Sequence, residues 1–139
     1  AADIQEVRTL TNNQIKLIAK IENQEGLDHL DEIVDASDMI MVARGDLGTE
    51  LPLEKIPEIQ MEIVQKCKAK NKPVIVATQM LSSMVNNPAP TRAEVSDIFL
   101  ATIEGANYLM LSEETTVGLH PVEAVTMMTR VIHEALTDE

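Results

Sequence analysis

Short apolar runs alternate with helix-length segments along this chain, and this alternation limits the possible folds more than any other feature. The runs are of strand length and cover residues 15–21, 39–43, 74–77 and 108–111. An amphipathic segment with apolar residues at helical spacing follows each run, at residues 27–34, 56–64, 95–103 and 122–132. Residues 2–10 are expected to form one more helix ahead of the first run. This order predicts one helix followed by four strand–helix units, which favours a parallel sheet.

Local sequence signals support these predicted boundaries. Thr91 followed three residues later by Glu94 is a capping box at the start of the third amphipathic segment. Pro121 suits the first position of the last helix. Pro73 suits the start of the third strand, where a missing N–H is tolerated.

Polar side chains follow every predicted strand. They are Lys20 and Glu22, Arg44 and Asp46, Thr78 and Gln79, and Ser112 and Glu114. In a TIM barrel the site lies at the C-terminal ends of the strands, and the complete barrel takes about 250 residues. The chain has 139 residues and only four units. We therefore expect an α/β fold that forms half of a (β/α)8 TIM barrel.

Two of these strand ends have the residues for a metal site beside an anion site. Lys20 and Glu22 are two residues apart, so an extended chain points both side chains to one face. Gly45 lets backbone N–H groups approach a ligand closely, and Asp46 adds a second carboxylate. Because Mg²⁺ is often bound by one or two carboxylates plus substrate oxygens, we interpret Glu22 and Asp46 as a metal pair. The alternative is a plain ion pair between Lys20 and Glu22, with Asp46 facing water.

Composition argues against nucleic acid and membranes as partners. The formal net charge of -12 repels phosphate backbones, and one Tyr, one Phe and no Trp offer little surface for base stacking. No apolar run approaches the length of a membrane span, and acidic residues near the start argue against a secretion signal. The single Cys67 is expected to be helical filler and fits a cytoplasmic protein.

Five sequence blocks, in order along the chain, resemble those of pyruvate kinases. They read Lys-Ile-Glu-Asn at 20–23, Ala-Arg-Gly-Asp-Leu-Gly at 43–48, Ala-Thr-Gln-Met-Leu at 77–81, Pro-Thr-Arg-Ala-Glu at 90–94 and Met-Leu-Ser-Glu-Glu-Thr at 110–115. Together they span nearly the whole chain. The resemblance implies that residues 1–139 are strands five to eight of the catalytic barrel. The first four strands, the lid domain and the C-terminal regulatory domain are then absent.

The resemblance also implies an activity and its cofactors. Pyruvate kinases transfer phosphate from phosphoenolpyruvate to ADP in glycolysis, giving pyruvate and ATP, with Mg²⁺ or Mn²⁺ and commonly K⁺. Lys20 is then expected to stabilise the phosphoryl group during transfer, while Glu22 and Asp46 hold Mg²⁺. The K⁺ ligands and the arginine that meets the phosphate belong to the other half of the barrel. We therefore expect this chain alone to be inactive.

The resemblance assigns the remaining site residues to the carbon skeleton of the substrate. The backbone around Ala43, Gly45 and Asp46 is expected to bind the substrate carboxylate. Thr78 contacts the substrate near the carbon that is protonated, and Ser112 belongs to a proton relay.

One residue departs from the family pattern. Glu113 stands between Ser112 and Glu114, where the family commonly has Gly. A side chain there restricts the backbone and adds charge close to the site. The three histidines match no family block and are interpreted as solvent-facing or structural; they are His29, His120 and His133.

Two other functions remain open from the sequence. A metal-dependent aldolase or lyase acting on pyruvate-like acids uses a related barrel, although the block at residues 90–94 disfavours it. A non-catalytic half-barrel that self-associates is the alternative that the short length favours. The family is tetrameric, so a homo-oligomer is expected. For this chain alone we expect a dimer or larger species, because four strands leave two open sheet edges.

Overall fold

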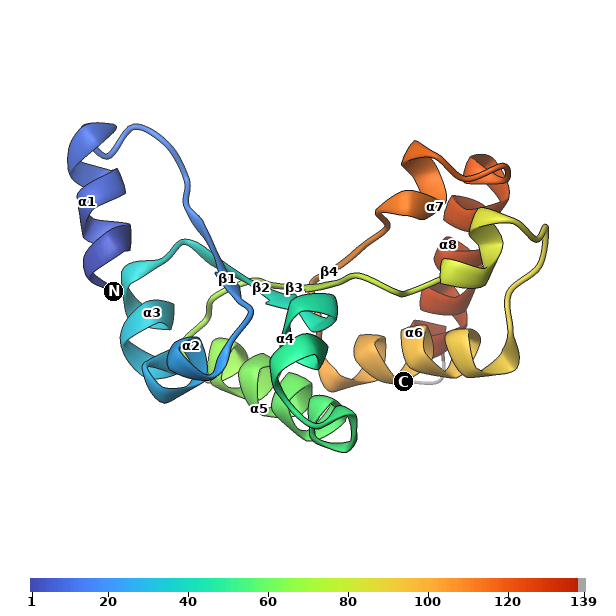
Figure 1. The fold of residues 1–139 in the computed structure, drawn as a ribbon, viewed down its shortest axis with the longest axis horizontal. Coiled ribbons are helices and arrows are strands. Elements are labelled where there is room, and N and C mark those ends of the chain that lie inside the picture. Colours follow the sequence, from blue (N-terminus) through green and yellow to red (C-terminus); the bar gives the residue numbers. More distant parts are fainter. Residues whose placement is uncertain (138–139) are drawn as a thin grey trace.

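The computed structural model of this chain describes residues 1–137 (Figure 1). The strands are β1 (Ile18–Ile21), β2 (Met39–Ala43), β3 (Val74–Ala77) and β4 (Tyr108–Met110). The helices are α1 (Ala2–Leu10), α2 (Gln24–Asp28), α3 (Leu30–Ala36), α4 (Arg44–Glu50), α5 (Ile56–Ala69), α6 (Arg92–Glu104), α7 (Glu113–Thr116) and α8 (Pro121–Thr137). Two short 3₁₀ turns complete the order, η1 (Leu53–Lys55) and η2 (Ser82–Val85). Within residues 1–137, no helix is both long enough and apolar enough to cross a membrane.

The strands form one parallel sheet in the order β1-β2-β3-β4. Figure 1 shows α2, α3 and α5 gathered on one side of the strands, with α1 at one end and α7 and α8 at the other. Along β2, Ile40 and Val42 are fully buried, whereas Met39 and Met41 are only half-buried. The core therefore lies between the sheet and the helices that cover one of its faces. The prediction of a partial TIM barrel is confirmed.

The structure shortens two of the predicted strands. β1 begins at Ile18 instead of residue 15, because Ile18 pairs with Met39, the first residue of β2. Residues 15–17 precede that pair and have no facing strand residue. β4 ends at Met110, which pairs with Ala77, the last residue of β3. Strand length is therefore set by the neighbouring strand and not by the apolar run alone.

The helices differ from the expectation mainly near the strand ends. The expected helix over residues 27–34 is two helices, α2 and α3, separated at His29. The periodicity of the sequence did not predict α4, which begins directly after β2, or the single turn of α7. The capping box of Thr91 and Glu94 is confirmed, and Pro121 is the first residue of α8. Burial raises the pKa of the Cys67 thiol to about 11, consistent with a core residue.

A partly buried ion pair between Arg8 and Asp38 connects α1 to the residues before β2. The Arg8 guanidinium donates to the Asp38 carboxylate at 3.0 Å and to the Ala36 carbonyl at 2.9 Å. The Leu17 N–H also donates to the Asp38 carboxylate, at 2.8 Å. That backbone hydrogen bond, reinforced by Arg8, lowers the pKa of Asp38 below its ordinary value.

We predict that Asp38 stabilises the fold at neutral pH and loses this effect in acid. Because its folded pKa is lowered, the stabilising contribution is present above its ordinary pKa and disappears as the pH falls through the folded pKa. Asp38→Asn is expected to lower the free energy of unfolding at pH 7 by about 1 kcal/mol. Urea unfolding at pH 7 and at pH 3 measures this, and the difference from wild type should shrink at pH 3. Glu6→Gln, on an exposed position of α1, is the matched control. An equal effect of Asp38→Asn at both pH values would contradict the prediction.

Candidate active site

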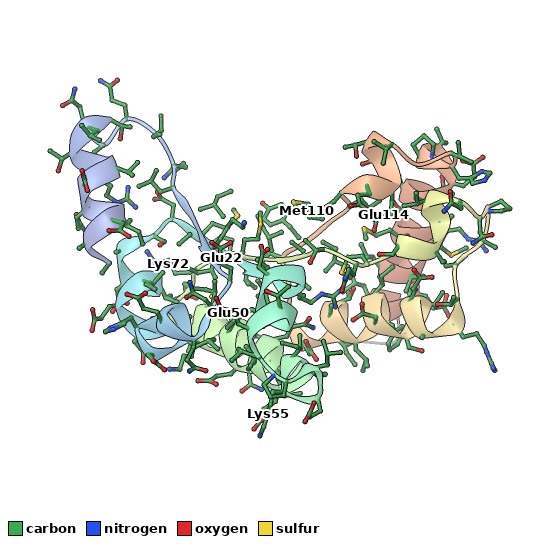
Figure 2. All side chains as sticks on the ribbon, viewed as in Figure 1. Glu22, Glu50, Lys55, Lys72, Met110 and Glu114 are labelled. Atoms are coloured by element: carbon green, nitrogen blue, oxygen red, sulfur yellow. The ribbon has the colours of Figure 1, made fainter. Side chains whose placement is uncertain are left out.

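The carboxyl ends of the strands bring the predicted site residues to one edge of the sheet. β2 and β3 end together, because Ala43 pairs with Ala77. The residues that follow the two strands, Arg44 and Thr78, therefore leave the sheet side by side. Figure 2 labels Glu22 directly after β1 and Met110 at the end of β4, both near the middle of the molecule.

Lys20, Glu22 and Asp46 form a carboxylate cluster around one ammonium group. Lys20 Nζ lies 2.8 Å from Glu22 Oε2 and 3.4 Å from Asp46 Oδ2. The three side chains are between 42% and 57% exposed, so the cluster opens to solvent. The hydrogen bond to Glu22 raises the pKa of Lys20, and Asp46 adds to this effect. Lys20 therefore carries its full positive charge at neutral pH.

Gly45 and Asp46 lie in the first turn of α4. The first N–H groups of a helix have no carbonyl partner within it. One of them, the Gly45 N–H, donates to Thr78 Oγ1 at 2.7 Å. A Cβ built on Gly45 would lie only 3.2 Å from that oxygen, so the close approach favours glycine. Ala43, the residue before the helix, is buried.

Thr78 and Gln79 leave β3 through an unusual backbone conformation. Their φ angles are 72° and 57°, both in the left-handed region. A positive φ is uncommon for any residue other than glycine, and a β-branched residue there is an outlier. Such outliers persist only where surrounding contacts hold them in place.

The Arg44 side chain makes contacts of this kind with the backbone of Thr78. Its Nε and Nη2 atoms donate to the Thr78 carbonyl at 3.2 and 2.7 Å. Its Nη1 atom donates to Asp97 on α6 at 2.7 Å and to Gln60 on α5 at 3.3 Å. The Arg44 side chain is only 10% exposed. It therefore connects the Thr78 backbone to α5 and α6 through hydrogen bonds and does not extend into solvent.

Ser112 shares a cavity with Thr78. The cavity has a volume of about 270 Å³ and is lined by Gly45, Thr78, Gln79, Ser82, Ser112, Glu113 and Glu114. Lys20 and Glu22 do not line it. The structure thus separates the predicted residues into the carboxylate cluster and this cavity. Residues 45 and 46, adjacent in α4, connect the two.

Glu114 closes one side of this cavity as a structural residue. It is only 2% exposed, and its carboxylate accepts the Leu81 N–H at 3.1 Å and the Ser112 N–H at 2.7 Å. Figure 2 places Glu114 at the turn of α7. The neighbouring Glu113 is exposed and adds a second carboxyl group to the lining.

Sequence reasoning missed two parts of this site. It assigned nothing to Asp97, which lies 53 residues from its partner Arg44 and belongs to no local pattern. It also missed α4, because Gly45 and Gly48 lower the helix propensity of so short a segment. The one available signal was Asp46, three residues after the end of an apolar run, since acidic residues favour the first turn of a helix.

Comparisons with known proteins agree on one family. A family model described as "Pyruvate kinase, barrel domain" matches residues 1–125. A pyruvate kinase of Sporosarcina psychrophila is 51% identical over 143 aligned positions, covering 100% of this chain and 24% of that protein. A pyruvate kinase of Clostridium acetobutylicum is 50% identical, covering 96% of this chain and 29% of that protein. The chain thus spans about a quarter of the length of these curated relatives.

A solved structure gives the same result. The crystal structure of a pyruvate kinase from Cryptosporidium parvum superposes with a TM-score of 0.96 at 45% sequence identity. The match covers 98% of this chain and 30% of that one.

Proposed function

Because the chain belongs to the pyruvate kinase family, we propose that it supplies part of the active site that transfers phosphate from phosphoenolpyruvate to ADP. In this proposal residues 1–139 are strands five to eight of the catalytic barrel, and K⁺ is bound by the other half. The observation that carries the proposal is the convergence of Lys20, Glu22 and Asp46 at the strand ends. A catalytic lysine and a metal-binding acid pair would need that arrangement.

The carboxylate cluster has the donor set that a divalent metal requires. Glu22 and Asp46 offer oxygen ligands, are half-exposed, and already converge on one cation, the Lys20 ammonium. Within residues 1–137, no group of three or more His, Cys, Asp or Glu side chains is placed to hold a metal. Two carboxylates with open positions for substrate oxygens suit Mg²⁺ or Mn²⁺. When bound, the ion would neutralise the carboxylates and polarise oxygens of the phosphorylated substrate.

Lys20 would act on the phosphoryl group during its transfer. Phosphoryl transfer depends mainly on positioning and on electrostatic stabilisation. The ammonium is fully charged and is held at the strand end by Glu22 and Asp46. A fixed cation of this kind stabilises charge that develops in the transition state.

The backbone around Ala43, Gly45 and Asp46 would bind the carboxylate of the substrate, and Thr78 would contact the substrate near the carbon that is protonated. The Thr78 hydroxyl accepts the Gly45 N–H, and its own proton has no acceptor within residues 1–137. That proton is therefore available to donate toward the cavity that Thr78 lines. A hydroxyl that accepts one hydrogen bond donates a second one more strongly. Ser112 lines the same cavity, in keeping with the proposed proton relay.

We predict that this chain binds Mn²⁺ through Glu22. Calorimetric titration should show divalent-cation binding that weakens about tenfold or more in Glu22→Gln, since the variant removes one carboxylate ligand. Glu50→Gln is the matched control, because Glu50 is exposed and is the last residue of α4. Equal weakening in both variants would indicate non-specific attraction and contradict a metal pair.

The role of Lys20 is testable in a complete enzyme that contains this segment. Lys20→Met keeps the bulk of the side chain and removes its charge. An interaction made mainly in the transition state lowers kcat and kcat/KM together when it is lost. We expect a loss on the order of 3 kcal/mol, or about a hundredfold in rate. A raised KM for phosphoenolpyruvate with an unchanged kcat would make Lys20 a binding residue only.

An assay with ADP also separates the alternatives. An aldolase or lyase acting on pyruvate-like acids would turn over its substrate without ADP. Phosphate transfer to ADP by the complete enzyme, slowed about a hundredfold by Lys20→Met, would exclude that function for this site.

Self-association is a second proposal, supported by the sheet edges. β1 and β4 are the edge strands, and their first residues, Ile18 and Tyr108, are about half exposed. An edge strand offers unpaired N–H and C=O groups to a second chain.

We predict that the isolated 139-residue chain forms a dimer or larger species in sedimentation velocity. Ile18→Lys should weaken this association, because a charge on an edge strand opposes pairing. Leu136→Lys, at an exposed position of α8, serves as the control. A strictly monomeric profile at high concentration would contradict the prediction.

A further inference from the structure

The backbone conformation of Thr78 is not explained by the local sequence. Thr78 is β-branched, yet its φ is 72°, and Gln79 beside it has a φ of 57°. L-residues avoid this region because Cβ crowds the following carbonyl oxygen. The contacts that keep Thr78 there therefore also decide where its hydroxyl lies.

The chain segment that begins α4 holds Thr78 at two points. The Arg44 guanidinium donates twice to the Thr78 carbonyl, and the N–H of the next residue, Gly45, donates to the Thr78 hydroxyl. The carbonyl and the hydroxyl of one residue are thus bound by two consecutive residues. Moving the carbonyl would move the hydroxyl relative to the Gly45 N–H.

Asp97 orients the guanidinium that makes these contacts. It accepts from Arg44 Nη1 at 2.7 Å, while Nε and Nη2 face the Thr78 carbonyl. Arginine has a rigid, planar arrangement of donors, so fixing one side of the group fixes the other. The Arg44 side chain is largely buried, whereas the Asp97 side chain is about one third exposed.

We propose that Arg44 and Asp97 are positioning residues that hold Thr78 in its left-handed conformation and so place its hydroxyl for contact with the substrate. Neither residue lines the cavity that contains Thr78 and Ser112. Both line a neighbouring cavity together with Gly45 and Gln79, and Arg44 contacts Thr78 through its carbonyl. The binding part of this inference rests on the proposed function, whereas the conformational part does not.

A purely structural role for the ion pair leads to a different expectation. The pair also ties α4 to α6, and this alone would explain a loss of stability when it is broken. If the ion pair only held the two helices together, any variant that still folds would keep the local geometry of Thr78 and Gly45. The decisive measurement is therefore local.

The first experiment records the NMR signals of the Thr78 Cα and Cβ nuclei and of the Gly45 amide in the 139-residue chain. Asp97→Asn keeps the size of the side chain and removes its charge. It is expected to shift these signals and to speed hydrogen exchange at Gly45. Glu104→Gln is the matched control, because Glu104 accepts from Gln60 in the same network without contacting Arg44. That variant should leave the Gly45 and Thr78 signals in place.

Arg44→Lys is the second variant, in case Asp97→Asn does not fold. It keeps the positive charge and removes the planar arrangement of donors, so it should shift the same signals. A folded Asp97→Asn or Arg44→Lys chain with wild-type signals at Gly45 and Thr78 would overturn the proposal.

The second experiment titrates the chain with pyruvate in the presence of Mg²⁺. Asp97→Asn should weaken pyruvate binding about tenfold, the scale of one hydrogen bond to a charged group. Thr78→Val removes the hydroxyl and keeps the shape of the side chain. If Asp97 acts through Thr78, the double variant binds no more weakly than Thr78→Val alone. Additive losses would show that Asp97 acts elsewhere and would overturn the positioning role.

The two experiments separate the failure of this inference from the failure of the proposed function. If Thr78→Val binds pyruvate as tightly as the wild-type chain, the substrate contact proposed for Thr78 is wrong. The NMR signals of the free chain still decide whether Arg44 and Asp97 hold the conformation of Thr78.

Discussion

The pairing of Ala43 with Ala77 is the constraint on which the rest of the site depends. Because β2 and β3 end at this pair, the first turn of α4 and the left-handed turn after β3 begin side by side. That coincidence lets Arg44 reach the Thr78 carbonyl and brings the Gly45 N–H to its hydroxyl. A shift of one residue in the register would turn the strand side chains to the opposite faces. The buried residues of both strands, such as Val42 and Val76, therefore fix the geometry of the site.

The sequence predicted the parts of this structure that follow from local periodicity. The ends of the first three strands, the grouping of Lys20 with Glu22 and the cap at Thr91 all came from spacing alone. It did not predict the left-handed backbone of Thr78, since a threonine ending an apolar run is expected to remain extended. It also did not reveal Asp97, whose role depends on a contact across the fold. Both missed features depend on tertiary contacts, because long-range contacts override local preference at those positions.

The carboxylate cluster and the Arg44 network differ in physical character. Lys20, Glu22 and Asp46 are half-exposed, and ion pairs in such positions add little to stability. Their convergence is therefore not explained by folding. In the other network the Arg44 side chain is only 10% exposed, and the buried side-chain polar atoms within residues 1–137 all have hydrogen-bond partners. The Arg44 network is suited to holding geometry, whereas the cluster is suited to exchanging partners with solvent ions and ligands.

Charge explains why the cluster would need a metal to act on an anionic substrate. Two carboxylates surround one ammonium, so the cluster holds more negative than positive groups, in a chain with a net charge of -12. A phosphorylated acid would be repelled by that field. A divalent cation shared by Glu22 and Asp46 would reverse the local sign and release Lys20 from neutralising them. Under the proposed function, the same two carboxylates then restrain Lys20 in the free chain and hold the metal that frees it for the phosphoryl group.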